Sequence, residues 1–113
     1  YAKMLKKNMG DIDWTMDAAA IERLIRGLNP WPSAYTRWNG KTLKIWRAEV
    51  LEKEYDGVCG EVVYTDKTSI HVKTGHGTLV LKELQLEGKK RMEADAFLRG
   101  YPMELHTVFE RSC

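Results

Sequence analysis

Hydrophobic residues recur at three- and four-residue steps between positions 15 and 28, which is the period of one face of an α-helix. The apolar stripe consists of Ala18, Ile21, Leu24, Ile25 and Leu28. We expect Thr15 to act as the N-cap, and Gly27 followed by Pro30 to end the helix. The pattern therefore predicts an amphipathic helix near the start of the chain.

Beyond residue 32 the pattern changes to short β-prone runs separated by glycine-containing turns. We expect strands at residues 35–38, 42–51, 61–65, 69–74 and 78–86. Asn39-Gly40 and Gly75-His76-Gly77 are typical of hairpin turns. A second, shorter helix is expected at residues 94–98, where Phe97 and Leu98 would pack on the strands.

The two longest runs do not alternate in one phase. In residues 42–51 the apolar positions move from Leu43 and Ile45 to Trp46, Ala48 and Val50, and in residues 78–86 from Leu79 and Leu81 to Leu84 and Leu86. Each slip predicts a β-bulge or a bend. Five to six antiparallel strands, two of them bent, favour a small OB-like barrel, so the expected fold is mainly β with flanking helices.

The composition indicates one domain, because 113 residues with 43% hydrophobic content suffice for a core without metals or disulfides. Cys59 and Cys113 lack metal or redox spacing, and we recognise no signal peptide or membrane-spanning run. We therefore expect a cytoplasmic protein with no metal site and no membrane partner. His71, His76 and His106 lie in no catalytic motif, so we interpret them as surface histidines and expect no catalytic residue.

The net charge of +2 is too small to indicate a polyanionic partner, but the basic residues are clustered. Such clusters fit either phosphate contacts or a solvated face balanced by acids. The acidic run at residues 49–56 is interpreted as a solvated loop. Most of the aromatic residues, including Trp31 and Trp46, are expected to pack in the protein, although stacking on unpaired bases is an alternative.

Three segments resemble one known family in order and spacing. They are Asp11-Ile12-Asp13-Trp14, then Ile25-Arg26-Gly27-Leu28-Asn29-Pro30-Trp31-Pro32-Ser33-Ala34, and Gly88-Lys89-Lys90-Arg91-Met92. Together they closely resemble the C-terminal domain of the bacterial methionyl-tRNA formyltransferase family. The resemblance implies an OB-like tRNA-binding domain over residues 11–113, preceded at residues 1–10 by the end of an interdomain linker.

The family formylates initiator methionyl-tRNA with 10-formyltetrahydrofolate as cosubstrate. Its catalytic Asn, His and Asp and its folate pocket belong to an N-terminal domain, and no residue here matches them. The resemblance therefore implies that this chain binds no cofactor and is inactive alone, while the full-length parent is an enzyme. Its expected partners are initiator methionyl-tRNA and the N-terminal catalytic domain of the same polypeptide, and we expect a monomer.

The resemblance raises the basic segments to candidate tRNA contacts: Lys6, Lys7, Arg37, Lys41, Lys44, Lys89, Lys90 and Arg91. Three alternatives remain open. The chain fits the corresponding domain of a formyltransferase that acts on a small substrate, a freestanding OB-type module for single-stranded nucleic acid, or a structural domain that docks on its catalytic partner.

Overall fold

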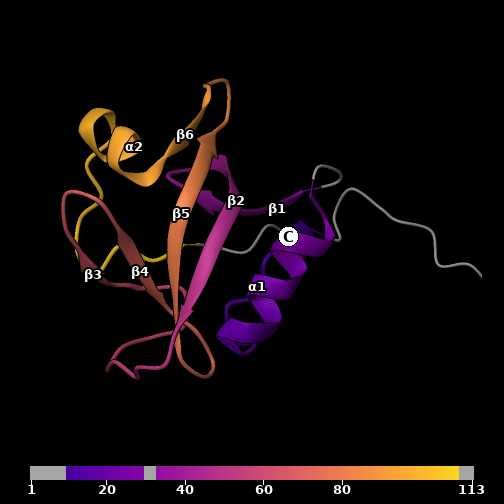
Figure 1. Cartoon of the computed structure of the whole chain (residues 1–113). Coiled ribbons are helices and arrows are strands. Elements are labelled where there is room, and N and C mark those ends of the chain that lie inside the picture. Colours follow the sequence, from indigo (N-terminus) through magenta and orange to yellow (C-terminus); the bar gives the residue numbers. More distant parts are fainter. Residues whose placement is uncertain (1–9, 30–32, 110–113) are drawn as a thin grey trace, which may run out of the picture.

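The structure, a computed structural model, describes residues 10–29 and 33–109 and contains six strands and two helices (Figure 1). The elements in chain order are α1 (Ala18–Gly27), β1 (Ala34–Trp38), β2 (Lys41–Leu51), β3 (Val62–Thr65), β4 (Ile70–Lys73), β5 (Thr78–Leu86), β6 (Arg91–Glu93) and α2 (Ala94–Gly100). Antiparallel pairing gives the strand order β1-β2-β5-β4-β3, with β6 also paired to β5. The predicted mainly β fold with flanking helices is confirmed.

Strand β5 lies at the centre of the sheet (Figure 1). One edge pairs with β2 along nearly its whole length, while the other pairs first with β4 and then with β6. Five of the six strands match predicted runs within a residue or two. The three-residue β6 was not predicted as a strand, because so short a run shows no alternation that distinguishes it from a turn.

Both predicted phase slips are confirmed, and they form a single feature. Where Arg47 faces Glu83, Trp46 is an extra residue on β2 and Lys82 is an extra residue on β5. The two insertions cancel, so the register is the same on either side of the irregularity. The four leucines of β5 therefore remain buried although the apolar phase changes between Leu81 and Leu84.

Helix α1 packs mainly on β2 and buries Ala18, Ile21 and Ile25, as the periodicity predicts. The expected cap is wrong: the helix begins at Ala18, and its N-cap, Asp17, makes no side-chain capping bond. The hydroxyl and backbone N–H of Thr15 instead donate to Asp13 Oδ1, at 2.6 and 3.1 Å. This local turn uses the hydroxyl group that the cap would need. The predicted stop at Pro30 lies outside the described residues.

Helix α2 confirms the second predicted helix. Phe97 is fully buried, and its ring centre lies 5.9 Å from that of Trp38 and 5.2 Å from that of Tyr101. Leu98 is partly buried and packs against the same core. The contact with Trp38 holds α2 against strand β1, while the contact with Tyr101 packs the end of the helix on the ring of Phe97.

Strands β1 and β3 form the two ends of the sheet, and irregular segments cover both edges. Beside β1, the backbone N–H of Ile12 donates to the carbonyl of Tyr35 at 2.9 Å. Beside β3, the backbone N–H of Phe109 donates to the carbonyl of Gly60 at 2.9 Å, and residues 106–107 bond to Val62. Covering the edges satisfies backbone groups that would otherwise remain open to other chains.

Trp14 joins these two covered edges. Its ring lies 5.8 Å from that of Phe109, and its indole N–H donates to Thr36 Oγ1 at 3.0 Å. Gly60 leaves room for the contact, because a Cβ there would lie 3.2 Å from the indole ring and 3.1 Å from the carbonyl oxygen of Phe109. The ends of the open sheet are thus linked through side chains, which gives the domain its barrel-like form.

The segment before α1 then reaches the hairpin between β4 and β5. The backbone N–H of Gly75 donates to the carbonyl of Met16 at 3.0 Å, and that of Ala18 donates to the carbonyl of His76 at 2.9 Å. A Cβ at Gly75 would lie 1.9 Å from the carbonyl oxygen of Thr15, so only glycine permits this approach.

We expect Trp14→Ala to lower the free energy of unfolding by about 3–5 kcal/mol, because it removes a buried indole from the junction of both sheet ends. Trp14→Phe keeps the ring contact but loses the hydrogen bond to Thr36, and should cost about 1 kcal/mol. Urea denaturation of both variants measures the difference. Equal stability of Trp14→Ala and the unmodified chain would contradict the proposed closure.

A carboxylate also fastens the tail to the sheet. Glu61 Oε2 lies 2.6 Å from His106 Nδ1, and Glu61 Oε1 accepts a hydrogen bond from the backbone N–H of Val58 at 3.0 Å. These two hydrogen bonds, the one from His106 first, lower the pKa of Glu61 below its ordinary value of 4.5.

Because the folded-state pKa of Glu61 is lowered, its stabilising contribution is present above pH 4.5 and is lost as the pH falls through the lower folded value. Glu61→Gln should therefore flatten the decline of unfolding free energy with acid. Urea titrations of both chains between pH 3 and 7 test this. Parallel pH profiles would show that the carboxylate does not contribute.

Candidate nucleic-acid interface

Two turns from distant parts of the sequence meet at one end of the sheet. The backbone N–H of Thr42, next to the β1–β2 turn, donates to Glu87 Oε1 at 3.0 Å, and the backbone N–H of Glu87 donates to the carbonyl of Thr42 at 2.9 Å. Glu87 begins the turn between β5 and β6, in which Gly88 has a φ of 79°. These reciprocal bonds fix the two turns side by side.

The predicted contact residues that the structure describes gather around these turns. This group, called here the basic end, consists of Arg37, Lys41, Lys44, Lys89, Lys90 and Arg91. Arg37, Lys41 and Lys44 come from β1 and β2, and the others come from the β5–β6 turn and the start of β6. Lys6 and Lys7, with most of the predicted linker, lie outside the described residues. Pairing of β2 with β5 brings together cations some 50 positions apart.

Three lysines of the basic end are free. Lys41, Lys89 and Lys90 are exposed, and within the described ranges none of them has an ion-pair partner within 4 Å. The pKa of the neighbouring Glu87 is lowered, first by the hydrogen bond from the backbone of Thr42 and further by nearby cations. Because Lys41, Lys89 and Lys90 are exposed and have no ion-pair partner among the described residues, their ammonium groups are available to a ligand.

The arginines of the basic end are held by the protein. Arg37 donates to the carbonyl of Gly40 at 2.8 Å and to Thr42 Oγ1 at 3.3 Å. Arg91 binds Glu83 through two hydrogen bonds of 2.7 and 3.1 Å, which lower the pKa of Glu83. The charge of Arg91, paired with a carboxylate, contributes less to attraction of an anion than the free lysines do, whereas Arg37 is held by neutral oxygens.

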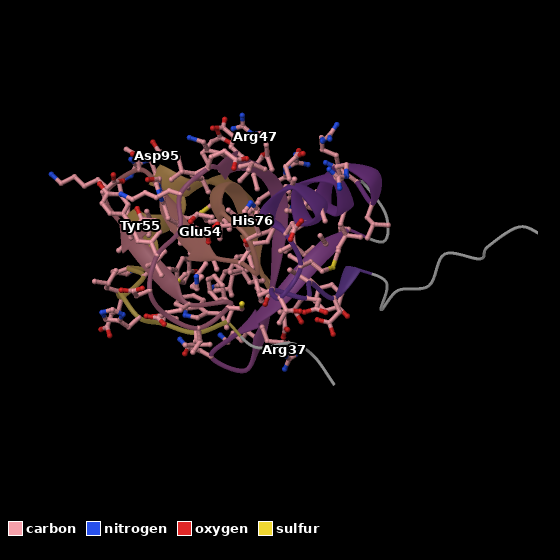
Figure 2. The ribbon with its side chains drawn as sticks, turned by 90° about the horizontal axis from the view of Figure 1, so that it is seen from below. Arg37, Arg47, Glu54, Tyr55, His76 and Asp95 are labelled. Carbon is pink, nitrogen blue, oxygen red and sulfur yellow. The ribbon has the colours of Figure 1, made fainter. Side chains whose placement is uncertain are left out.

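Arg47 is an exposed cation of β2 that does not belong to the basic end. It donates to Glu93 at 2.8 Å and lies 4.0 Å from Glu83. Arg37 and Arg47 lie on opposite sides of the domain (Figure 2). The charge of Arg47 is balanced by Glu83 of β5 and Glu93 of β6.

Trp46 departs from the expectation that it packs in the interior. It is half-buried on the outer face of the sheet, where Arg91 lies 4.5 Å and the Lys44 ammonium 5.6 Å from its ring centre. The bulge explains the position, because the extra residue turns outward together with Arg47. Trp14 and Trp38 do pack on the core, as expected, and Trp31 lies outside the described residues.

His71 is not the ordinary surface histidine that its strand pattern predicted. It is half-buried against Tyr64, and its Nδ1 is buried with no hydrogen-bond partner in the described part of the chain. Burial lowers the pKa of His71 below its usual value. His76 and His106 are exposed, as expected.

The acidic run is only partly a solvated loop. Glu54 Oε2 accepts a hydrogen bond from the backbone N–H of Gly77 at 2.7 Å and lies 3.3 Å from His76 Nδ1 (Figure 2). Glu49 lies in β2. In the ranges described, we find no cluster of three residues suited to hold a metal ion, and no helix with the length and apolarity that crossing a bilayer requires.

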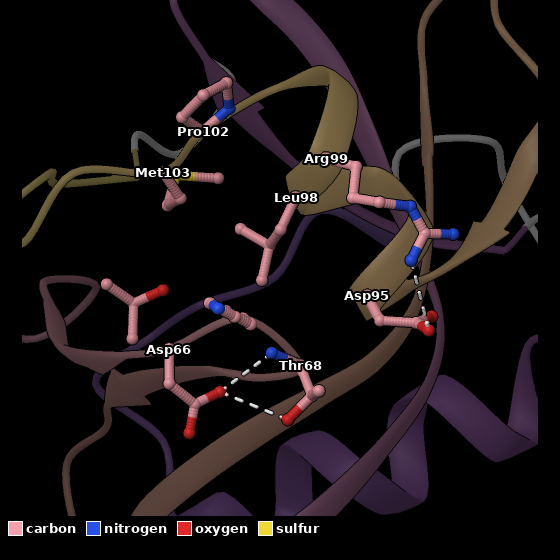
Figure 3. A pocket seen from close by; sticks show the side chains of 9 residues that line it. Asp66, Thr68, Asp95, Leu98, Arg99, Pro102 and Met103 are labelled. Carbon is pink, nitrogen blue, oxygen red and sulfur yellow. Dashed lines mark hydrogen bonds and ion pairs between the residues drawn. The ribbon is translucent and has the colours of Figure 1, made fainter.

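A pocket of about 630 Å³ lies between the β3–β4 turn and α2 (Figure 3). Its wall is apolar at Leu98, Pro102 and Met103. Its acids are already engaged: the Asp66 carboxylate accepts a bond from the backbone N–H of Thr68 at 2.8 Å, and Asp95 lies 3.7 Å from Arg99. The polar groups of this pocket thus hold the turn and the helix.

A model of the formyl transferase C-terminal domain matches residues 4–102. The chain belongs to this family. The methionyl-tRNA formyltransferase of Agathobacter rectalis is 50% identical over 109 residues, which cover 96% of this chain and 35% of that protein. That of Alkaliphilus metalliredigens is 45% identical over 104 residues, covering 92% of this chain and 33% of that protein. The chain spans about a third of the length of these curated relatives.

Among solved structures, HypX from Aquifex aeolicus in complex with tetrahydrofolic acid superimposes with a TM-score of 0.65 at 18% identity, covering 96% of this chain and 21% of that one. At this identity the likeness shows the fold alone. The family model and the similar relatives confirm the formyltransferase C-terminal domain identified from the sequence motifs.

Proposed function

We propose that this formyltransferase C-terminal domain binds initiator methionyl-tRNA and positions it for formylation. The observation that carries the proposal is the meeting of two cationic turns at the basic end. Relatives 45–50% identical to the chain are methionyl-tRNA formyltransferases. A substrate with a phosphate backbone accounts for several exposed lysines at one end of the sheet better than a small substrate does.

The proposal assigns the chemistry to the part of the parent enzyme that precedes this domain. That part would bind 10-formyltetrahydrofolate and carry the catalytic residues, while the present domain would orient the tRNA. Holding the aminoacyl end in place converts an encounter between two molecules into a reaction within one complex, which is a large kinetic gain. The domain would act in the cytoplasm, as a part of a single polypeptide.

The overall charge does not argue against RNA binding. The excess of two positive charges is small, but a polyanion responds to the local arrangement of cations within a Debye length of about 10 Å. Lys89 and Lys90 are adjacent and exposed in the same turn. Each phosphate contact made by such a lysine releases counterions and steepens the dependence of affinity on salt.

Lys89→Gln combined with Lys90→Gln should weaken binding of initiator tRNA and lower the slope of log affinity against log salt by about 2. Fluorescence anisotropy of labelled tRNA across a salt series measures both quantities. The measurement begins at low ionic strength, where electrostatic binding is strongest.

The matched control is Lys53→Gln combined with Lys73→Gln, which removes the same charge from the opposite end of the sheet. It should change the salt slope by less than the Lys89 and Lys90 pair. Equal effects of the two pairs would indicate that only net charge matters. Preference for an unpaired oligonucleotide over tRNA would instead support a general single-strand binder.

A further inference from the structure

The β5–β6 turn is held by Gln85 of β5, and Gln85 is held in turn by Trp46 of β2. Trp46 Nε1 donates to Gln85 Oε1 at 3.0 Å, and Gln85 Nε2 donates to the backbone carbonyl of Lys89 at 3.0 Å. The backbone N–H of Lys89 in turn donates to the carbonyl of Leu86 at 2.8 Å. Both polar backbone groups of Lys89 are thereby fixed.

The indole and the carbonyl of Lys89 together fix which way the amide of Gln85 faces. Because an indole N–H can only donate, it requires the carbonyl oxygen of Gln85 on its side. The amide nitrogen is then directed to the carbonyl of Lys89. Because the carbonyl of Lys89 can only accept, both partners fix the same orientation of the amide, and a residue without a ring N–H at position 46 would leave only one of them to hold Gln85.

The bulge supplies this indole at the required position. As the extra residue of β2, Trp46 lies on the outer face beside Gln85, and Arg91 of β6 lies over its ring at 4.5 Å. Glu83 holds Arg91 in place through two hydrogen bonds. The indole of β2 is thus fixed against Arg91 of β6. Through its bond to Gln85 it supports the turn that joins β5 to β6.

We propose that Trp46 and Gln85 are positioning residues, which hold the turn of Lys89 and Lys90 in the conformation that meets the tRNA phosphates. This inference rests on the proposed function and names the residues on which the lysine positions depend. Neither residue needs to touch RNA. Without them the two lysines would keep their charge but lose a fixed place on the sheet, so that ordering the turn would oppose binding.

Two substitutions test the positioning role. Trp46→Phe keeps an aromatic ring beside Arg91 but removes the N–H donor, and Gln85→Met keeps the length of the side chain but removes both hydrogen bonds. Trp46→Phe should weaken tRNA binding about 2- to 10-fold, the equivalent of one hydrogen bond, and Gln85→Met, which removes two, should weaken it at least as much. Each should also accelerate hydrogen exchange at the amide of Lys89, measured by NMR without RNA.

The same substitutions in a chain that carries Lys89→Gln and Lys90→Gln should cause no further loss of binding. A full additional loss in that background would overturn the positioning role, because it would show that Trp46 or Gln85 acts independently of the lysines. Unchanged exchange at Lys89 in both variants would also overturn it.

Tyr64→Phe is the matched control, because it also removes a hydrogen bond donated by an aromatic side chain. That bond, from the Tyr64 hydroxyl to Asp66 at 3.0 Å, lies in the distant β3–β4 hairpin. It should alter neither tRNA affinity nor exchange at Lys89. If the lysine pair itself has no effect on tRNA binding, the proposed function fails. Exchange at Lys89 then still shows whether Trp46 and Gln85 hold the turn, so the two failures are distinguishable.

Discussion

The contact of Trp14 with Phe109 is the constraint on which the rest of the domain depends, because it joins the two ends of an otherwise open sheet. Each ring belongs to a segment that covers an edge strand, so the contact fixes two edges together. Unlike a closing strand pair, a ring contact does not require the end strands to share a register. The sheet can therefore close into a barrel-like form around strands of unequal length.

The paired bulges at Trp46 and Lys82 solve a different problem, which is to alter one face of the sheet without disturbing the other. A single extra residue would turn every later side chain of its strand to the opposite face. A compensating residue on the neighbouring strand limits the change to one position. The core keeps its leucines, while Trp46 comes to lie between Lys44 and Arg91 on the outer face.

Much of the fold was predictable from the sequence, because the helices and most strands are specified by local periodicity. The three- and four-residue steps of the apolar positions from Ala18 to Leu28 placed α1, and the phase slips located the bulges. The prediction of Thr15 as a cap was wrong because Asp13 accepts its hydroxyl hydrogen bond. Strand β6 was not predictable because it forms by pairing with β5, which its own sequence does not show. The burial of His71 was not predictable because it depends on Tyr64 of the neighbouring strand.

The candidate site was predicted as a set of residue types, but its arrangement was not. No pattern near Lys41 shows that it lies beside the turn of Lys89, since that proximity follows from the pairing of β2 with β5. The involvement of Gln85 carried no signal in the sequence, because an isolated glutamine on a strand is typical of any solvated face. Its importance follows only from bonds to Trp46 and to the backbone of Lys89.

The basic end divides its cations by chemical type. Its arginines are held by carbonyl, hydroxyl or carboxylate oxygens, as suits a planar group with several directed donors. Of its lysines, Lys44 lies over the Trp46 ring, and Lys41, Lys89 and Lys90 have no ion-pair partner among the described residues. A lysine ammonium is a point charge that accepts phosphates from many directions, and phosphate contacts carry no sequence information. In the proposed function such a surface would supply affinity and orientation. Discrimination of the initiator tRNA must then come from other contacts in the parent enzyme, because these lysines would meet the backbone of any tRNA alike.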